Sequence, residues 1–223
     1  MEVFLSPSDF AFLWSDCKRC FWLKVRHNQR KPDGAFPRVF TILDESQKKL
    51  FRGMHTSRIL PEMPAGVFAF ADGWVKSKPF RIAKDLYIII RGRYDSILKL
   101  DAGDYAVVDF KTTIPNEGTL YKYEHQLMAY AFALENADDK EARLEPVSDV
   151  GLLCFEPTNM SRGSEGDYNF VTRPLWLGAR TDYKPLEKTI RGMAKLAASE
   201  EPPPPGEKCS LCAYREQARQ NTW

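Results

Sequence analysis

The sequence predicts an α/β domain, because strand-like and helix-like segments alternate along much of the chain. Residues 91–95 and 105–112 have the character of β-strands, and residues 101–104 between them form a turn signal, Asp-Ala-Gly-Asp. Residues 120–134 carry an apolar stripe at helical spacing. The apolar run at residues 150–155 suits a buried strand.

Size and composition are those of a folded protein with a sizeable core. The chain has 223 residues, of which 43% are hydrophobic and 28% charged, a balance that argues against disorder. Its net charge is only +2, so a polyanion would have to bind to local patches. Apolar runs such as residues 86–90 are too short to span a bilayer, and residues 1–7 lack the features of a secretory signal. We therefore expect a cytoplasmic protein, in which the five cysteines serve as ligands or thiols.

The first third of the chain predicts two helices. Residues 6–9 resemble a helix start, and Phe10, Leu13 and Trp14 follow at helical spacing. A second helix is expected from about Val39 to Met54, with an apolar stripe that includes Leu50. Residues 61–79 carry Gly and Pro at intervals, which favours loops and short strands.

A basic segment with aromatic residues lies at residues 18–31. Phe21 and Trp22 stand among its cations, which suits a single nucleic-acid strand held by phosphate contacts and base stacking. A solvated charged face is the alternative interpretation. The cations are Lys18, Arg19, Lys24, Arg26, Arg30 and Lys31.

The last third predicts two strands and a long helix. The strand at residues 150–155 is followed by another at residues 168–177, interrupted by Pro174. The final helix carries a regular apolar face, and the proline-rich residues 202–206 end it and form a stiff spacer. The apolar positions of that helix are Leu186, Ile190, Met193 and Ala197.

Two carboxylates and an ammonium group are predicted on one side of the sheet. Asp109 and Lys111 lie two residues apart on a strand and share a face, while Phe110 points into the opposite, apolar layer. Asp95 on the neighbouring strand can bring a second carboxylate to the same end of the sheet. Unpaired charges are costly to bury, whereas a hard divalent cation prefers oxygen ligands. The alternative is a solvated strand face with a weak ion pair.

Cysteine pairs near the two ends of the chain predict a shared metal centre. Cys17 and Cys20 form one Cys-x-x-Cys motif, and Cys209 and Cys212 form another, 189 positions beyond Cys20. Four thiolates suit either tetrahedral zinc or an iron–sulfur cluster. The alternative is two pairs of thiols that never meet. Cys154 lies in an apolar strand and is expected to be a core residue.

Three motifs in order resemble a known family. Gly92-Arg93-Tyr94-Asp95, Asp109-Phe110-Lys111 and residues 126–130 follow the series G-x-x-D, D-x-K and Q-x-x-x-Y. This series resembles the PD-(D/E)XK nuclease superfamily, specifically its RecB-like branch. The flanking cysteines resemble its iron–sulfur members, such as the CRISPR-associated RecB-like exonucleases and AddB-type nuclease domains.

The resemblance implies a fold and a set of site residues. The fold would be a restriction-endonuclease-like core, with a mixed central sheet flanked by helices and the terminal segments joined by the cysteine centre. Asp95, Asp109 and the carbonyl of Phe110 would bind Mg²⁺ or Mn²⁺, with Lys111 positioning or activating the attacking water. His55 would complete the metal shell. Gln126 and Tyr130 would orient the substrate or support the site.

The resemblance also implies an activity and partners. We expect a single nuclease domain over residues 1–223, with residues 1–38 and 199–223 forming the cysteine-joined region. It would hydrolyse DNA, preferably single-stranded and from an end, within a repair, recombination or CRISPR pathway. The related iron–sulfur nucleases usually split their cysteines one and three, whereas this chain splits them two and two, which leaves the type of centre open. The resemblance favours a 4Fe-4S cluster, with zinc as the rival. A non-catalytic nucleic-acid-binding or assembly subunit and a structure-selective endonuclease are the alternative functions.

Overall fold

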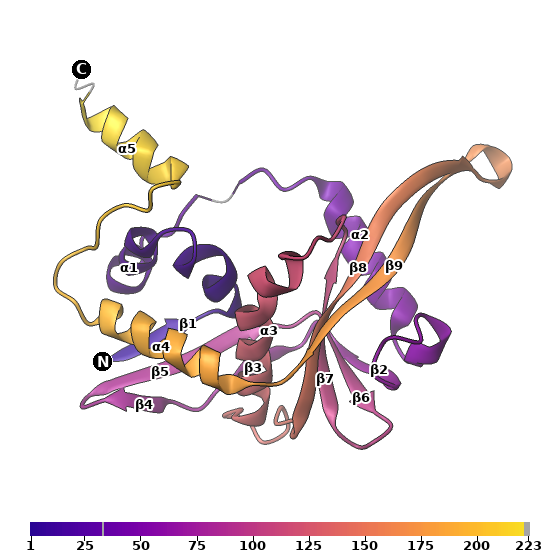
Figure 1. Cartoon of the computed structure of the whole chain (residues 1–223), viewed down its shortest axis with the longest axis horizontal. Coiled ribbons are helices and arrows are strands. Elements are labelled where there is room, and N and C mark those ends of the chain that lie inside the picture. Colours follow the sequence, from indigo (N-terminus) through magenta and orange to yellow (C-terminus); the bar gives the residue numbers. More distant parts are fainter. Residues whose placement is uncertain (33, 221–223) are drawn as a thin grey trace.

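The structure is a computed structural model that describes residues 1–32 and 34–220, and it contains two mixed β-sheets with helices packed around them (Figure 1). The larger sheet is five-stranded, in the order β2-β6-β7-β8-β9, with β7 and β8 parallel and the other neighbours antiparallel. Its strands are β2 (Gly66–Ala71), β6 (Ser96–Leu100), β7 (Tyr105–Lys111), β8 (Val147–Arg162) and β9 (Tyr168–Arg180).

The smaller sheet is four-stranded and is organised around β5. This strand pairs in parallel with β1 and antiparallel with β3 and β4. Its strands are β1 (Glu2–Leu5), β3 (Trp74–Lys76), β4 (Phe80–Ala83) and β5 (Leu86–Arg93).

The two sheets meet at a bend, where backbone hydrogen bonds join one connecting segment to another. The amide of Asp72 donates to the carbonyl of Asp95 at 3.0 Å, and the amide of Tyr94 donates to the carbonyl of Gly73 at 2.9 Å. These bonds join the β2–β3 segment to the β5–β6 segment, so both strands turn together from one sheet into the other. Asp95 therefore stands at the junction between the sheets.

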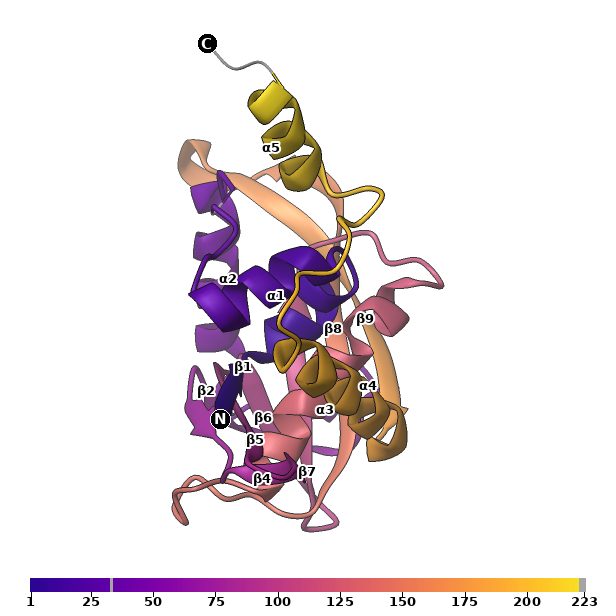
Figure 2. The ribbon, with the colours of Figure 1, turned by 90° about the vertical axis from the view of Figure 1, so that its left-hand side faces the viewer.

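Helices cover both layers of the fold. The helix α3 connects the parallel strands β7 and β8, and α4 packs beside it (Figures 1 and 2). A six-residue π-helix (Asp9–Trp14) and two 3-10 turns (Thr56–Arg58 and Ser164–Gly166) complete the elements. The α-helices are α1 (Lys18–His27), α2 (Arg38–Phe51), α3 (Thr119–Glu135), α4 (Tyr183–Ala197) and α5 (Ser210–Gln220).

Apolar residues form one layer on each side of the larger sheet. On the α3 side, Leu127 and Leu134 pack with Val107 and Leu152 of the sheet. On the other side, an aromatic cluster packs between the sheet and the end of α2, and it consists of Phe51, Phe68, Phe110 and Phe155. The predicted α/β class with a mixed sheet flanked by helices is confirmed.

The hairpin of β8 and β9 is longer than the sequence predicts. Its outer part, residues 156–173, is largely exposed and extends beyond the body of the molecule as a two-stranded ribbon (Figure 1). Pro174 does not interrupt β9 but pairs with Phe155. Because β9 is an edge strand, a residue without an amide proton is tolerated there. Within the described residues, no helix has both the length and the apolarity needed to cross a bilayer.

Candidate active site and cysteine centre

The strand β7 places a carboxylate and an ammonium group on the side of the sheet that α3 covers. Asp109 and Lys111 share this face and form an ion pair, while Phe110 points into the aromatic cluster on the other side. The side chain of Lys111 is 24% exposed, so the ammonium group lies at the edge of the buried region and not in open solvent. The alternation of β7 thus separates a polar face from an apolar one, as the sequence predicts.

Asp95 joins these residues from the bend between the sheets. Its Oδ2 accepts a hydrogen bond from the backbone amide of Phe110 at 3.1 Å, which fixes the carboxylate beside β7. Two carboxylates and one ammonium group therefore meet at this end of the sheet. The structure brings together Asp95, Asp109 and Lys111, and their catalytic roles stay a prediction.

Asp109 is a buried carboxylate with a polar partner at each oxygen. It is 5% exposed, and its Oδ1 accepts a hydrogen bond from Gln126 Nε2 at 3.1 Å. Its Oδ2 forms the ion pair with the ammonium group of Lys111. Burial raises the pKa of the Asp109 carboxyl to about 6, since the lowering by Lys111 only partly offsets it and Asp95 adds to the rise.

Two side chains of α3 hold parts of the site in place. Gln126 is 6% exposed and contacts Asp109 directly, whereas Tyr130, one turn later, donates its hydroxyl proton to the backbone carbonyl of Arg93 at 2.6 Å. A Cβ at Gly92 would lie only 3.1 Å from the ring of Tyr130. Gln126 therefore orients an acidic side chain, and Tyr130 holds the end of β5.

The polar cluster includes three residues that the sequence did not predict as site residues, namely Asp44, Lys48 and Asp72. Lys48 of α2 contacts Asp44 at 2.8 Å, Asp72 at 2.9 Å and Asp95 at 3.0 Å, and its side chain is only 8% exposed. Burial alone would lower the pKa of Lys48, but the three carboxylates outweigh it and raise that pKa. Asp44, Gln47, Lys48 and Phe51 follow helical spacing, so this face of α2 is visible in the sequence as a mainly polar stripe.

The helix α2 turns its polar side inward. Its outward side carries Val39, which is 54% exposed, and Leu50, which is 63% exposed. The predicted helix is therefore present over Arg38–Phe51, but two positions of its expected apolar stripe face outward, while Leu43 is half-buried and Met54, beyond the helix, packs on the aromatic cluster. The inward position is taken by Asp44 and Lys48, which contact the site.

The structure does not bring His55 to the carboxylates. Its Nε2 lies 3.1 Å from Asp101 Oδ2, and its Nδ1 lies 2.7 Å from Ser57 Oγ. Asp95 directly precedes β6 and Asp101 directly follows it, so the two ends are about 20 Å apart at the usual rise per residue. The side chain expected to complete a metal shell thus belongs to a turn at the opposite end of β6.

An open cleft leads to the site. It has a volume of about 550 Å³, and Asp95 and Lys111 lie in its wall. Its rim is aromatic: the rings of Phe36 and Phe40 are 5.7 Å apart on one side, and those of Phe12 and Tyr123 are 5.5 Å apart on another. The site is therefore accessible to a ligand that offers flat rings as well as a charge.

The donor set fits a hard divalent cation. Carboxylate oxygens are the ligands that Mg²⁺ and Mn²⁺ prefer, and Asp109 offers a buried carboxylate that is positioned by Gln126 and Lys111. Asp95 lies beside it, with Asp44 and Asp72 in contact with the same ammonium group of Lys48. The cluster can therefore hold a cation between β7 and the bend.

Replacing Lys48 by Met is expected to destabilise the metal-free protein. Three carboxylates would lose their shared positive partner, and an unsatisfied polar group of this kind costs about 1–3 kcal/mol. Urea unfolding in EDTA measures the loss, and added Mn²⁺ should restore part of it by supplying positive charge. Lys49→Met, an exposed neighbour on α2, is the matched control. Equal unfolding curves for the two variants would contradict the assignment.

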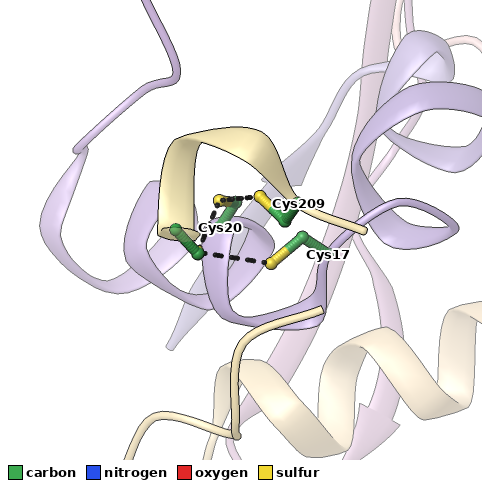
Figure 3. A group of neighbouring side chains, drawn as sticks. Cys17, Cys20 and Cys209 are labelled. Atoms are coloured by element: carbon green, nitrogen blue, oxygen red, sulfur yellow. Dashed lines mark hydrogen bonds between the residues drawn. The ribbon is translucent and has the colours of Figure 1, made fainter. Parts of the chain in front are cut away.

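The four terminal cysteines form one buried cluster. Their Sγ atoms all lie within 4.8 Å of one another, and each cysteine is at most 7% exposed. Figure 3 shows Cys17 and Cys20 of the α1 segment facing the segment that begins α5. The amide of Gly206 donates to Cys17 Sγ at 3.3 Å. The predicted meeting of the two Cys-x-x-Cys motifs is confirmed.

This cluster fits a cysteine-ligated centre. Burial alone would raise the pKa of Cys17, but hydrogen bonds from the amides of Cys20 and Gly206 outweigh it and lower that pKa to about 7. All five cysteines are free thiols, and Cys154 lies apart from the cluster in the core strand β8. The donor set suits an iron–sulfur centre or a single metal ion.

The fold and the polar cluster are those of a metal-dependent nuclease class. The chain matches the family model described as "PD-(D/E)XK nuclease superfamily" over residues 16–217, and it therefore belongs to this superfamily. No curated protein matches the chain. Among solved structures, it is similar in fold to one titled "Crystal structure of SSO0001", with a TM-score of 0.50 and 15% identity over 89% of this chain and 78% of that one.

Proposed function

We propose that the protein is a divalent-metal-dependent nuclease that hydrolyses single-stranded DNA from an end. The observation that carries the proposal is the meeting of the Asp109 carboxylate, the Lys111 ammonium group and Asp95 at an open cleft. Superfamily membership supports metal-dependent phosphodiester hydrolysis on a nucleic acid. The choice of DNA, of a single strand and of an end is the finer part of the proposal.

The roles of the residues follow from charge. A bound Mg²⁺ or Mn²⁺ would polarise the scissile phosphate and lower the pKa of the attacking water. Asp95 and Asp109 would hold it, with the carbonyl of Phe110 as a further ligand. The ammonium group of Lys111 would donate a hydrogen bond to the water or to the phosphate, where negative charge increases in the transition state. Gln126 keeps Asp109 oriented, and His55 has no part in this scheme because of its position.

The aromatic rim supports a preference for single strands. A cleft of about 550 Å³ suits a single nucleotide better than a duplex, whose bases are already stacked on one another. Phe36 is 73% exposed and Phe40 is 40% exposed, so their rings are available to an unpaired base. A strand could then enter with its phosphate toward Lys111 and a base against these rings.

Replacing Phe40 by Ala is expected to weaken the binding of a single-stranded oligonucleotide by about tenfold, the usual effect of losing one stacking ring. Affinity for a blunt duplex should change much less. Fluorescence anisotropy in EDTA gives both dissociation constants without cleavage. Phe70→Ala removes a ring of similar exposure on β2 outside the cleft and serves as the control. The same loss for both nucleic acids would count against a single-strand preference.

The cysteine centre is proposed to be a 4Fe-4S cluster, as the resemblance implies. Zinc is the second candidate, because one observation favours it. The Sγ atoms of Cys17–Cys212, Cys20–Cys209 and Cys20–Cys212 are each 3.7 Å apart. Four sulfurs around one tetrahedral zinc ion lie about 3.8 Å apart at the usual Zn–S distance. A cluster in which each thiolate ligates a different iron would hold them further apart.

We also propose a family branch, a pathway, a cellular location and a domain organisation for the protein. The three motifs support the RecB-like branch, and with it a role in repair, recombination or a CRISPR pathway with protein partners. The free thiols support a cytoplasmic location. A single domain over residues 1–223 is proposed, because the cysteine centre ties both terminal segments to the same body.

Anaerobic purification with elemental analysis, followed by cleavage assays on linear and circular single strands, tests the proposal. Iron with acid-labile sulfide supports the cluster, and zinc alone supports the second candidate. Mn²⁺-dependent loss of linear strands only indicates an exonuclease, whereas nicking of circles indicates an endonuclease. Asp95→Asn should abolish either activity. If the wild-type protein binds DNA but shows neither cleavage nor Mn²⁺ binding, it is a non-catalytic binding or assembly subunit.

A further inference from the structure

A second hollow lies on the smaller sheet, apart from the cleft of the catalytic candidates. It has a volume of about 710 Å³ and contains residues from β1, β3, β5 and the α1 segment. Five cations line it, together with an exposed indole and only two carboxylates, Asp138 and Asp139. We call this hollow the β3–β5 groove, defined by Lys24, Arg30, Trp74, Lys76, Arg91 and Arg93.

Strand register explains how the groove gathers its charge. Trp74 lies opposite Arg93, and Lys76 lies opposite Arg91, in the antiparallel pairing of β3 with β5. Directly paired residues, and residues two apart on a strand, project from the same face of a sheet. One indole and three cations therefore stand on one exposed face, with the indole of Trp74 71% exposed.

The opposite face of the same ribbon is packed and holds it rigid. Val75 is buried, and a Cβ at Gly92 would lie 2.7 Å from Pro7 and 3.1 Å from Tyr130. The hydroxyl of Tyr130 also holds the carbonyl of Arg93. The exposed cations are thus presented by a fixed platform, which lowers the entropy lost when a ligand binds.

Part of this charge has no internal partner. Lys24, Lys76 and Arg93 form ion pairs with Asp9, Asp138 and Asp72 in turn. Arg30 and Arg91 form no ion pair with the described residues. The guanidinium group of Arg91 lies 5.1 Å from the ring centre of Phe4, which orients it at the groove.

The groove adjoins the candidate active site. Arg93 Nη2 lies 3.1 Å from Asp72 Oδ1, and Asp72 and Asp95 both contact Lys48. Along the backbone, Arg91 is four residues from Asp95, which is about 13 Å of extended strand. A chain that occupies the active site and continues past Asp72 therefore reaches the groove after a few nucleotides.

We propose that the β3–β5 groove is a second nucleic-acid-binding site, which holds the phosphates of a single strand through Arg91, Arg93 and Arg30 and stacks a base on Trp74. This inference rests on the proposed function, because it extends the path of the strand cut at the active site. An indole beside several guanidinium groups is the combination that single strands require. Phe21 and Trp22, which the sequence predicts as stacking residues, are 0% and 6% exposed, so the prediction that they stack on bases is wrong.

The binding test compares variants of the groove with matched controls elsewhere. In EDTA, Trp74→Ala is expected to weaken the binding of a fluorescent single-stranded oligonucleotide by about tenfold. Arg91→Gln should reduce the slope of log affinity against log salt by about 0.7. Tyr214→Ala and Arg81→Gln, exposed residues outside the groove, should leave both quantities unchanged. Thermal unfolding of each variant establishes that the fold is retained.

A second measurement separates this inference from the nuclease proposal. A short chromogenic phosphodiester cannot extend from the active site to the groove, so the ratio of kcat/KM on the oligonucleotide to kcat/KM on the ester should fall about tenfold in Trp74→Ala. If both groove variants match the wild type in oligonucleotide affinity and salt slope, and ester cleavage is intact, the proposed binding groove is wrong and the nuclease proposal stands. Weaker oligonucleotide binding in these variants, with no cleavage of the oligonucleotide or the ester and no Mn²⁺ binding by any protein, would support the groove and reject the nuclease. Binding of polyglutamate, but not of the oligonucleotide, through Arg91 would overturn the groove as a nucleic-acid site.

Discussion

Replacing Lys111 by Met is expected to lower DNA cleavage by about a hundred- to a thousandfold, the usual effect of removing one donor to a developing negative charge. Lys111 is the ammonium group that faces the buried oxygen of Asp109 at the wall of the cleft. Oligonucleotide binding should fall far less, because the β3–β5 groove and the aromatic rim are untouched. Single-turnover cleavage and anisotropy with the same oligonucleotide separate the two effects.

The same substitution has a predictable cost in stability. Without Lys111, Asp109 loses its ionic partner on β7 and its pKa rises further, and breaking a buried pair from one side costs about 3–5 kcal/mol. The double variant Asp109→Asn with Lys111→Met removes the charge as well and should recover much of that loss in denaturant unfolding. Near wild-type turnover in Lys111→Met would contradict the proposed role of this residue.

Replacing Cys20 by Ser is expected to release the C-terminal helix. Cys212 is the buried residue of α5, so the cysteine cluster is the main attachment of this helix to the body. Cys20 contacts both Cys209 and Cys212. When the free metal concentration is a thousand times the dissociation constant, binding contributes about 4 kcal/mol of stability, and losing the centre removes this amount. Hydrogen exchange should show faster exchange in α5 and α1, and little change in β7 or β8.

Cys154→Ala is the matched control for this prediction. Cys154 is fully buried in the core and distant from the cluster, so its loss affects packing but not metal content. Elemental analysis should show a full metal complement in this variant and a large deficit in Cys20→Ser. A full complement in Cys20→Ser, with α5 still protected, would show that the cysteines do not share a centre.

The catalytic candidates could be predicted because their arrangement is local. Alternation along β7 places Asp109 and Lys111 together and Phe110 opposite, and it depends only on neighbouring residues. Asp95 was expected on the neighbouring strand, whereas it lies between β5 and β6, but its proximity to β7 was predicted correctly. The two Cys-x-x-Cys motifs also carry their own spacing, so their meeting was predictable although the chain between them is long.

The contribution of α2 could not be predicted from its own pattern. An amphipathic helix normally turns its apolar side to the core, yet Val39 and Leu50 point outward and Asp44 and Lys48 point inward. That orientation is set by Asp72 and Asp95, which lie at the bend between the sheets and far along the chain from α2. For the same reason the burial of Trp22, whose indole donates to the carbonyl of Ser199, depends on a segment far along the chain.

The cysteine cluster also fixes the order in which the chain can fold. Cys20 and Cys209 are separated by 189 positions, so joining them early would close a very large and unfavourable loop. The sheets contain shorter connections, such as the hairpin of β6 and β7, and can form first. Metal insertion would then be the closing event of folding. Newly made protein that has not yet received its metal would have complete sheets, including β1, but an untethered α5 segment, which is the first place where a protease would cut.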